Sequence, residues 1–172
     1  MICRLADTER LADKKIVLLA HTFGRYGDER EYIEKLYARL PETIQARMVV
    51  ITDKIYQTRA RFVLQGGLFT ITGRMHAAVS TFQGGKPAIS LSYSTKFRGV
   101  IGDSLDQQPL VIEADHDALW HSGEIVDRVC EKVDGLWSDY AGLCDRIRNR
   151  VKELQQQVSS TLDRIAVDRP SQ

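Results

Sequence analysis

A chain of 172 residues, 43% of them hydrophobic and 27% charged, is long enough for one well-buried domain and leaves little room for a second. Its 24 basic and 23 acidic side chains leave a net charge of only +1, which excludes bulk attraction to nucleic acid or to anionic lipid. The apolar runs are far shorter than the ~20 residues that cross a bilayer, so we expect no membrane span.

The beginning of the chain and the cysteines point to an intracellular protein. Cys3, Cys130 and Cys144 are odd in number and far apart, so they predict neither a disulfide framework nor a zinc site. They fit a reducing, cytoplasmic compartment. The first residues mix acids with bases and lack the apolar region of a signal peptide. We therefore expect residues 1–14 to form a linker or N-terminal extension.

Strand and helix patterns alternate from residue 16 onward. The apolar run 16–20 predicts a buried strand, and Asp28 is placed to cap the helix after it, which Pro41 closes. A second strand is expected at 48–51. A short helix then runs to the glycine pair at 66–67.

The same alternation continues in the middle of the chain. Residues 68–72 predict a third strand, which leads through Gly73 into a helix over 74–82. Two more strands are expected at 88–92 and 110–113. Short strands alternating with helices predict an α/β, Rossmann-like fold with a mostly parallel sheet, because parallel neighbours need a crossing segment between them.

The last part of the chain predicts one long amphipathic helix or two. From Ile125 to Ile165 the apolar residues recur every three or four positions, with a period of about 3.6. A break is expected at Gly135 or Gly142. We expect the first half to pack on the sheet and the second half to contact another domain or a partner chain. A membrane-surface helix is disfavoured because the other faces mix acids, bases and glutamines.

A candidate ligand site comes after the third predicted strand. In open parallel sheets, ligands bind beyond the carboxyl ends of strands, where helix N-termini present free N–H groups. Gly73, Arg74, Met75 and His76 fall at such a place. The guanidinium of Arg74 can bind a carboxylate or phosphate, and His76 can donate a proton to the same anion. The alternative is a surface arginine and a packed histidine at a helix start.

Two weaker candidates lie near the neighbouring strands. Residues 92–96 come after the fourth strand, where the hydroxyl groups and Lys96 suit phosphate or sugar, although capping a helix explains the hydroxyl groups better. His21 and Asp28 are candidates by position, with a turn-stabilising role as the alternative. The sequence contains no motif for metal catalysis or dinucleotide binding, so we expect no metal.

The segment GRMHAAVSTFQGGKPAISLSYSTKFRGV resembles the carboxyl-terminal lobe of polysaccharide pyruvyl transferases. The family's core reads R-x-H, an apolar helix, G-x-P, a strand, and Y-x-x-K. Its positions are occupied here by Arg74, His76, Gly85, Pro87, Tyr93 and Lys96. With its flanks, the resemblance covers residues 15–113.

The resemblance implies a GT-B-like enzyme that transfers pyruvate from phosphoenolpyruvate to a sugar of a cell-surface polysaccharide. Phosphoenolpyruvate is then the donor substrate, no further cofactor is needed, and the acceptor is a sugar or a lipid-linked oligosaccharide. Arg74 and His76 become the catalytic residues. Arg74 holds the negatively charged groups of the donor, and His76 acts as the acid or stabilises the phosphate. The substrate-binding residues become Gly73, Met75, Tyr93, Lys96 and His21.

The resemblance also implies that a second lobe is needed. We expect residues 15–135 to form the carboxyl-terminal lobe and 136–172 a helical extension, with the amino-terminal lobe missing or supplied by a partner chain that contacts the extension. The isolated chain is then expected to fold but to turn over poorly. Two other functions stay open: a glycosyltransferase or epimerase lobe that binds a nucleotide-sugar, and a non-catalytic binding or assembly module.

Overall fold

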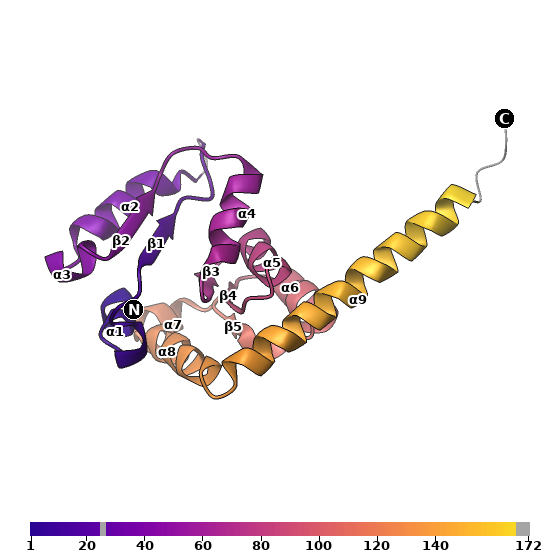
Figure 1. Cartoon of the computed structure of the whole chain (residues 1–172). Helices are drawn as coiled ribbons and strands as arrows, with labels where there is room; N and C mark the ends of the chain where they lie inside the picture. The colour runs from indigo at the N-terminus through magenta and orange to yellow at the C-terminus, as the bar shows by residue number, and fades with distance from the viewer. Residues whose placement is uncertain (25–26, 168–172) are drawn as a thin grey trace.

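The computed structural model describes residues 1–24 and 27–167, with side chains up to residue 165, and confirms the predicted α/β class with parallel strands, flanking helices and a long C-terminal helix (Figure 1). The described strands form two sheets. In one, β1 (Ile16–Leu19) pairs with β2 (Met48–Ile51). In the other, β4 (Ala88–Ser92) lies between β3 (Thr70–Thr72) and β5 (Val111–Glu113). All three pairings are parallel.

The crossover between β1 and β2 consists of α2 (Glu29–Ala38) and α3 (Glu42–Gln45). Asp28 caps α2 as predicted, because its side chain accepts a hydrogen bond of 3.0 Å from the N–H of Arg30. The chain leaves α2 before Pro41, which stands at the start of α3. The predicted order of strand, helix and strand is therefore present here.

The two-stranded sheet is only partly covered. Val17 and Val49 are paired across its strands, and they are 45% and 44% exposed. None of the side chains of α2 is buried. Parallel strands usually have both faces covered, so this half of the molecule is unusually open.

The hydrophobic core lies on the three-stranded sheet. The helical segments around it are, in chain order, α4 (Gln57–Gly66), α5 (Met75–Gln83), α6 (Thr95–Phe97), the π-helical η2 (Arg98–Ser104), η3 (Gln108–Leu110), α7 (Asp117–His121) and α8 (Glu124–Leu136). Several of the most deeply buried apolar side chains come from four of these segments and from β4: Phe82, Ile89, Phe97, Ile101 and Val129. Most of the predicted site residues follow β3 and β4, so this core supports the strands that position them.

Residues 1–14 differ from the expected linker. They contain α1 (Ile2–Ala6) and η1 (Glu9–Leu11), and the side chains of Leu5 and Leu11 belong to the buried core. The guanidinium of Arg47 donates a hydrogen bond of 3.1 Å to the carbonyl oxygen of Ala6. The segment is thus a packed part of the body, because its buried apolar side chains cover core surface that would otherwise face water.

The C-terminal stripe forms two helices, α8 and α9 (Tyr140–Val167), separated just after Gly135 as predicted. The first half of α9 packs on the core through Ile147 and Val151. Its second half extends away from the body (Figure 1) and exposes Val158, Leu162 and Ile165 by 58–60%. Although α9 has 28 residues, neither it nor any other described helix has the apolar length to cross a membrane.

Candidate functional site

The carboxyl ends of β3, β4 and β5 meet at one edge of the sheet, which we call the rim. Thr72 of β3 stands beside Ser90, and Ser92 of β4 stands beside Glu113. A Cβ atom on Gly73 would contact the carbonyl oxygen of Leu91 at 3.7 Å, so the turn after β3 lies directly against β4. The segment that starts with Gly73 therefore lies where ligands bind in parallel sheets.

Arg74 is the N-cap residue of α5 and is held in place by two contacts. Its backbone N–H donates a hydrogen bond of 2.9 Å to Oγ1 of Thr72. Its guanidinium donates through Nε (2.8 Å) and Nη2 (2.6 Å) to Oε1 of Glu29. The side chains of Arg74 and Glu29 are 43% and 25% exposed. Arg74 thus lies at the surface of the rim and already binds a carboxylate.

Glu29 connects the two sheets. It is the first residue of α2, and its Oε2 accepts hydrogen bonds from the backbone N–H groups of His21 (2.8 Å) and Thr22 (3.2 Å), just beyond β1. Partial burial disfavours the charged carboxylate, but the hydrogen bonds from His21, Arg74 and Thr22 outweigh it and hold the pKa of Glu29 below its ordinary value. The carboxylate is therefore ionised at neutral pH.

Four N–H groups from two strand ends surround this one carboxylate: two from the backbone of His21 and Thr22 and two from Arg74. Donors that converge in this way form an anion-binding site. The sequence alone did not single out Glu29. Its only signal was an acidic residue at the start of the helix after the first strand, and its contact with Arg74 spans 45 residues.

The remaining residues of the predicted segment face different surroundings. His76 is exposed on the first turn of α5, whereas Met75 is partly buried against the core. His21 is half-buried and contributes its backbone N–H to Glu29. The structure thus brings Arg74 and His21 together through Glu29, leaves His76 open to solvent, and gives Met75 a packing contact.

The segment after β4 leaves two predicted side chains accessible. Tyr93 and Lys96 are both exposed, and the ring of Tyr93 packs edge-on against Phe97 with 5.4 Å between ring centroids. The hydroxyl of Ser92 donates to the carbonyl oxygen of Ser94 at 3.0 Å. Among the described residues no side chain caps α6. The hydroxyl groups therefore do not act as the helix caps that were one interpretation of this segment.

Other polar surfaces lie away from the rim. A cavity of about 970 Å³ opens at the opposite end of β5, where its lining includes Leu110, Leu136 and charged groups of both signs. None of the predicted site residues lines it, and its mixed charge favours no single class of ion. The charged and hydrogen-bonding groups converge at the rim and not at this cavity.

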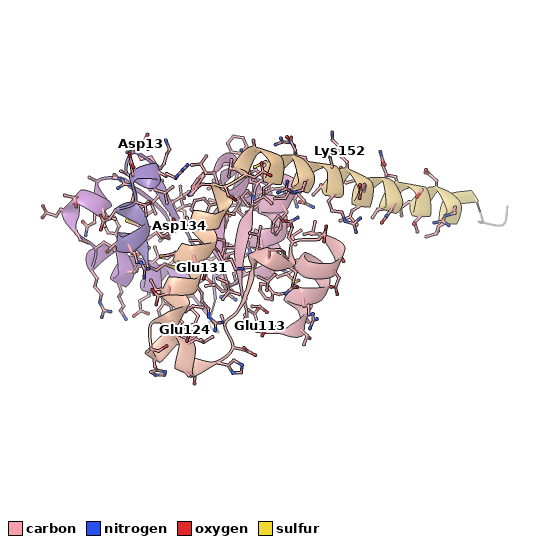
Figure 2. All side chains as sticks on the ribbon, turned by 90° about the horizontal axis from the view of Figure 1, so that it is seen from below. Asp13, Glu113, Glu124, Glu131, Asp134 and Lys152 are labelled. Carbon is pink, nitrogen blue, oxygen red and sulfur yellow. The ribbon has the colours of Figure 1, made fainter. Side chains whose placement is uncertain are left out.

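Several acidic side chains lie along α8. Figure 2 shows Glu124, Glu131 and Asp134 along this helix. The carboxylate of Glu124 is paired with Arg128 at 2.7 Å. Within residues 1–24 and 27–167, no three His, Cys, Asp or Glu side chains are grouped to hold a metal ion.

Comparison of the chain with protein-family models, with curated proteins and with solved structures finds no match. The chemistry of the rim has to be argued from its geometry. That geometry consists of an arginine fork and two backbone N–H groups around a carboxylate, with an exposed histidine on the same helix turn. It suits the binding of a small anionic ligand.

Proposed function

We propose that this chain is the anion-binding lobe of a transferase of the polysaccharide pyruvyl transferase type. In this proposal Arg74 binds the carboxylate or phosphate of phosphoenolpyruvate, and the acceptor is a sugar hydroxyl group. The observation that supports it most is that the guanidinium of Arg74 already binds a carboxylate beyond the carboxyl end of a parallel strand. A cytoplasmic location agrees with the free thiols of its cysteines.

Pyruvyl transfer requires a proton donor and a positive charge that neutralises the departing phosphate. A sugar hydroxyl adds to C2 of the enol phosphate as a proton joins the methylene carbon, and a second hydroxyl of the sugar then displaces phosphate from C2 to close the ketal. We assign the proton to His76, which is exposed on the first turn of α5. Arg74 neutralises the departing phosphate. Tyr93 and Lys96, accessible after the adjacent strand β4, add a hydrogen bond and a positive charge.

Ligand binding tests this proposal directly. Phosphoenolpyruvate is expected to raise the melting temperature of the chain, whereas UDP and CMP are not, because only a bound ligand stabilises by mass action. Arg74→Ala removes hydrogen bonds to a charged group, worth ~1.5–3 kcal/mol, and should weaken phosphoenolpyruvate binding about 10- to 100-fold in isothermal titration. His76→Ala is expected to lower turnover more than binding when a sugar acceptor and a second lobe are supplied.

A matched control comes from α8. Arg128 is also paired with a glutamate, and its side chain is 43% exposed like that of Arg74. Arg128→Ala should therefore leave phosphoenolpyruvate binding unchanged. Stabilisation by UDP in place of phosphoenolpyruvate would support a nucleotide-sugar lobe instead. Equal losses in the two arginine variants would contradict a specific site at Arg74.

The second half of α9, which extends away from the body, favours a second candidate function, self-assembly. Val158, Leu162 and Ile165 lie on one face of the helix, and the same face is covered by the body of the chain further back, at Ile147 and Val151. A second copy that paired in parallel would collide with that body, whereas an antiparallel copy keeps the two bodies apart. Apart from Val158, the residues between Leu154 and Leu162 are uncharged glutamines, serines and a threonine, whereas Asp163 and Arg164, between Leu162 and Ile165, carry opposite charges.

Sedimentation at increasing concentration tests self-assembly. The chain is expected to form a dimer that Val158→Lys with Leu162→Lys abolishes, because charges in an apolar seam lose their water. Gln156→Lys with Ser160→Lys places the same charges on the opposite face and should leave the dimer intact. A chain that stays monomeric throughout would refute this function.

A further inference from the structure

The anion site at the rim is filled by the chain's own carboxylate. We propose that Glu29 occupies the position of the ligand's carboxylate or phosphate group, and that the ligand binds there by displacing the Glu29 side chain. The identity of the ligand as phosphoenolpyruvate rests on the proposed function. The exchange itself depends only on the geometry around Glu29.

The donors around Glu29 match an incoming anion without rearrangement. One carboxylate oxygen accepts from the backbone of His21 and Thr22, and the other accepts twice from Arg74. A ligand carboxylate presents two oxygens with the same spacing and charge, and a ligand phosphate presents negatively charged oxygens to the same donors. Two of these donors come from the loop after β1, so the ligand would bridge the two sheets. This adds the backbone of His21 and Thr22 to the binding groups.

Glu29 can leave this position without disturbing the core. It is the first residue of α2, its side chain is 25% exposed, and α2 contains no buried side chain. Rotation of the carboxylate into solvent therefore breaks hydrogen bonds but no apolar packing. The backbone of Arg74 is anchored independently of Glu29, because its N–H donates to Oγ1 of Thr72, so the residue keeps its place at the rim.

The exchange makes Glu29 an internal competitor. While Glu29 is bound, it neutralises the positive charge of Arg74. Only an anion that competes with Glu29 for the same N–H groups can then bind. The apparent affinity for a ligand equals the intrinsic affinity multiplied by the fraction of molecules in which Glu29 has left the site. Removing the carboxylate should therefore strengthen anion binding, whereas the loss of a residue that binds the ligand would weaken it.

Titration with simple anions tests the inference. Inorganic phosphate, acetate and phosphoenolpyruvate are titrated into the wild-type chain, Glu29→Gln and Glu29→Ala by calorimetry. Both variants are expected to bind phosphate and acetate at least about tenfold more tightly than the wild type, because the competitor is gone. The added substitution Arg74→Ala should cancel the gain. Glu124→Gln, which disrupts another glutamate–arginine pair, should bind like the wild type.

Weaker or unchanged anion binding in Glu29→Gln would overturn the exchange. This variant keeps the size of the side chain and an oxygen for the N–H of His21, so it addresses the case in which Glu29→Ala does not fold. In a folded Glu29→Ala, formate should raise the melting temperature more than in the wild type, by refilling the site; an equal rise would also overturn the exchange.

The titrations separate this inference from the proposed function. Stronger phosphate and acetate binding in the Glu29 variants, with no binding of phosphoenolpyruvate to any form, would support the exchange and remove the proposed donor. Phosphoenolpyruvate binding to the wild type that depends on Arg74 but weakens in Glu29→Gln would support the donor and overturn the exchange.

Discussion

The two sheets of this molecule are built from similar strands but differ in how far helices cover them. In β4, Ala88, Ile89 and Ser90 have no exposed surface, whereas Val17 and Val49 of the two-stranded sheet remain almost half exposed. We call these regions the covered half and the open half. Because the strands of the open half are at least as apolar, the difference shows that burial depends on how the crossover helices pack, and not on strand sequence alone.

The candidate site lies between these two halves. Arg74 comes from the covered half and Glu29 from the open half, and their ion pair joins them. The backbone donors after β1 belong to the open half as well. A ligand that replaced Glu29 would therefore be held by groups from both. The contrast between the halves can be tested by perturbing each in turn.

The largest effect is expected from truncating α9. Ending the chain before Gly142 removes Ile147 and Val151 from the core of the covered half. Each buried aliphatic side chain contributes ~2–5 kcal/mol, so this chain should fail to fold. Ending it after Gln156 keeps both residues and should leave the melting temperature nearly unchanged. Circular dichroism distinguishes these outcomes, and similar losses in the two truncations would contradict the assignment of the first half of α9 to the core.

A smaller effect is expected from two phenylalanines on neighbouring helices. Phe82 of α5 is fully buried, whereas Phe62 of α4 is 79% exposed. Phe82→Ala should lower the free energy of unfolding by ~3–5 kcal/mol, because it leaves a cavity in the covered half. Phe62→Ala should change it by less than ~0.5 kcal/mol. Urea denaturation measures both, and a large loss for Phe62→Ala would show that the exposed face of α4 is packed against other residues.

The smallest effect is expected on acidification. The pKa of Glu29 is lowered in the folded chain, so its stabilising contribution is complete above the ordinary glutamate pKa of about 4.3 and is lost as the pH falls through the folded-state pKa. Ion pairs that solvent still reaches contribute little, on the order of 1 kcal/mol, so the loss is small. Amide hydrogen exchange should show that protection of β1 and β2 falls before that of β4 as the pH is lowered below about 4.3.

Glu29→Gln isolates this contribution. The neutral side chain does not titrate, so the extra loss of protection in the open half at low pH should be absent from this variant. Asp28 also has a lowered pKa, of about 2, because it accepts hydrogen bonds from Arg30, and it titrates at lower pH. If the two halves of the wild-type chain lost protection at the same pH, the open half would not open separately from the covered half.

Local patterns predicted the elements well. The bounds of β2 and β4 agree with the predicted strands 48–51 and 88–92, and Asp28 caps α2 as expected. Each of these features depends on residues close in sequence, such as an apolar run between turn residues. The separation of the sheet into two was not predicted, because strand pairing depends on contacts between distant residues.

Two further differences have physical causes. The apolar residues of 1–14 lie among charged ones without a clear period, although Leu5 and Leu11 are buried. The π-helical η2 gives no signal of its own, since its bonding pattern differs only slightly from that of an α-helix. At the site, the position of Arg74 was predicted from the strand before it. Glu29 was not, because only the folded chain brings it to Arg74.

The division into two sheets leaves more unpaired backbone than one continuous sheet would. Two sheets have four edge strands, whereas a single five-stranded sheet has two. Edge strands offer free N–H and C=O groups to any passing polypeptide, and β1 carries no charged residue to discourage such pairing. The chain should therefore be prone to aggregate when concentrated, and it is suited to accept an added strand from another polypeptide.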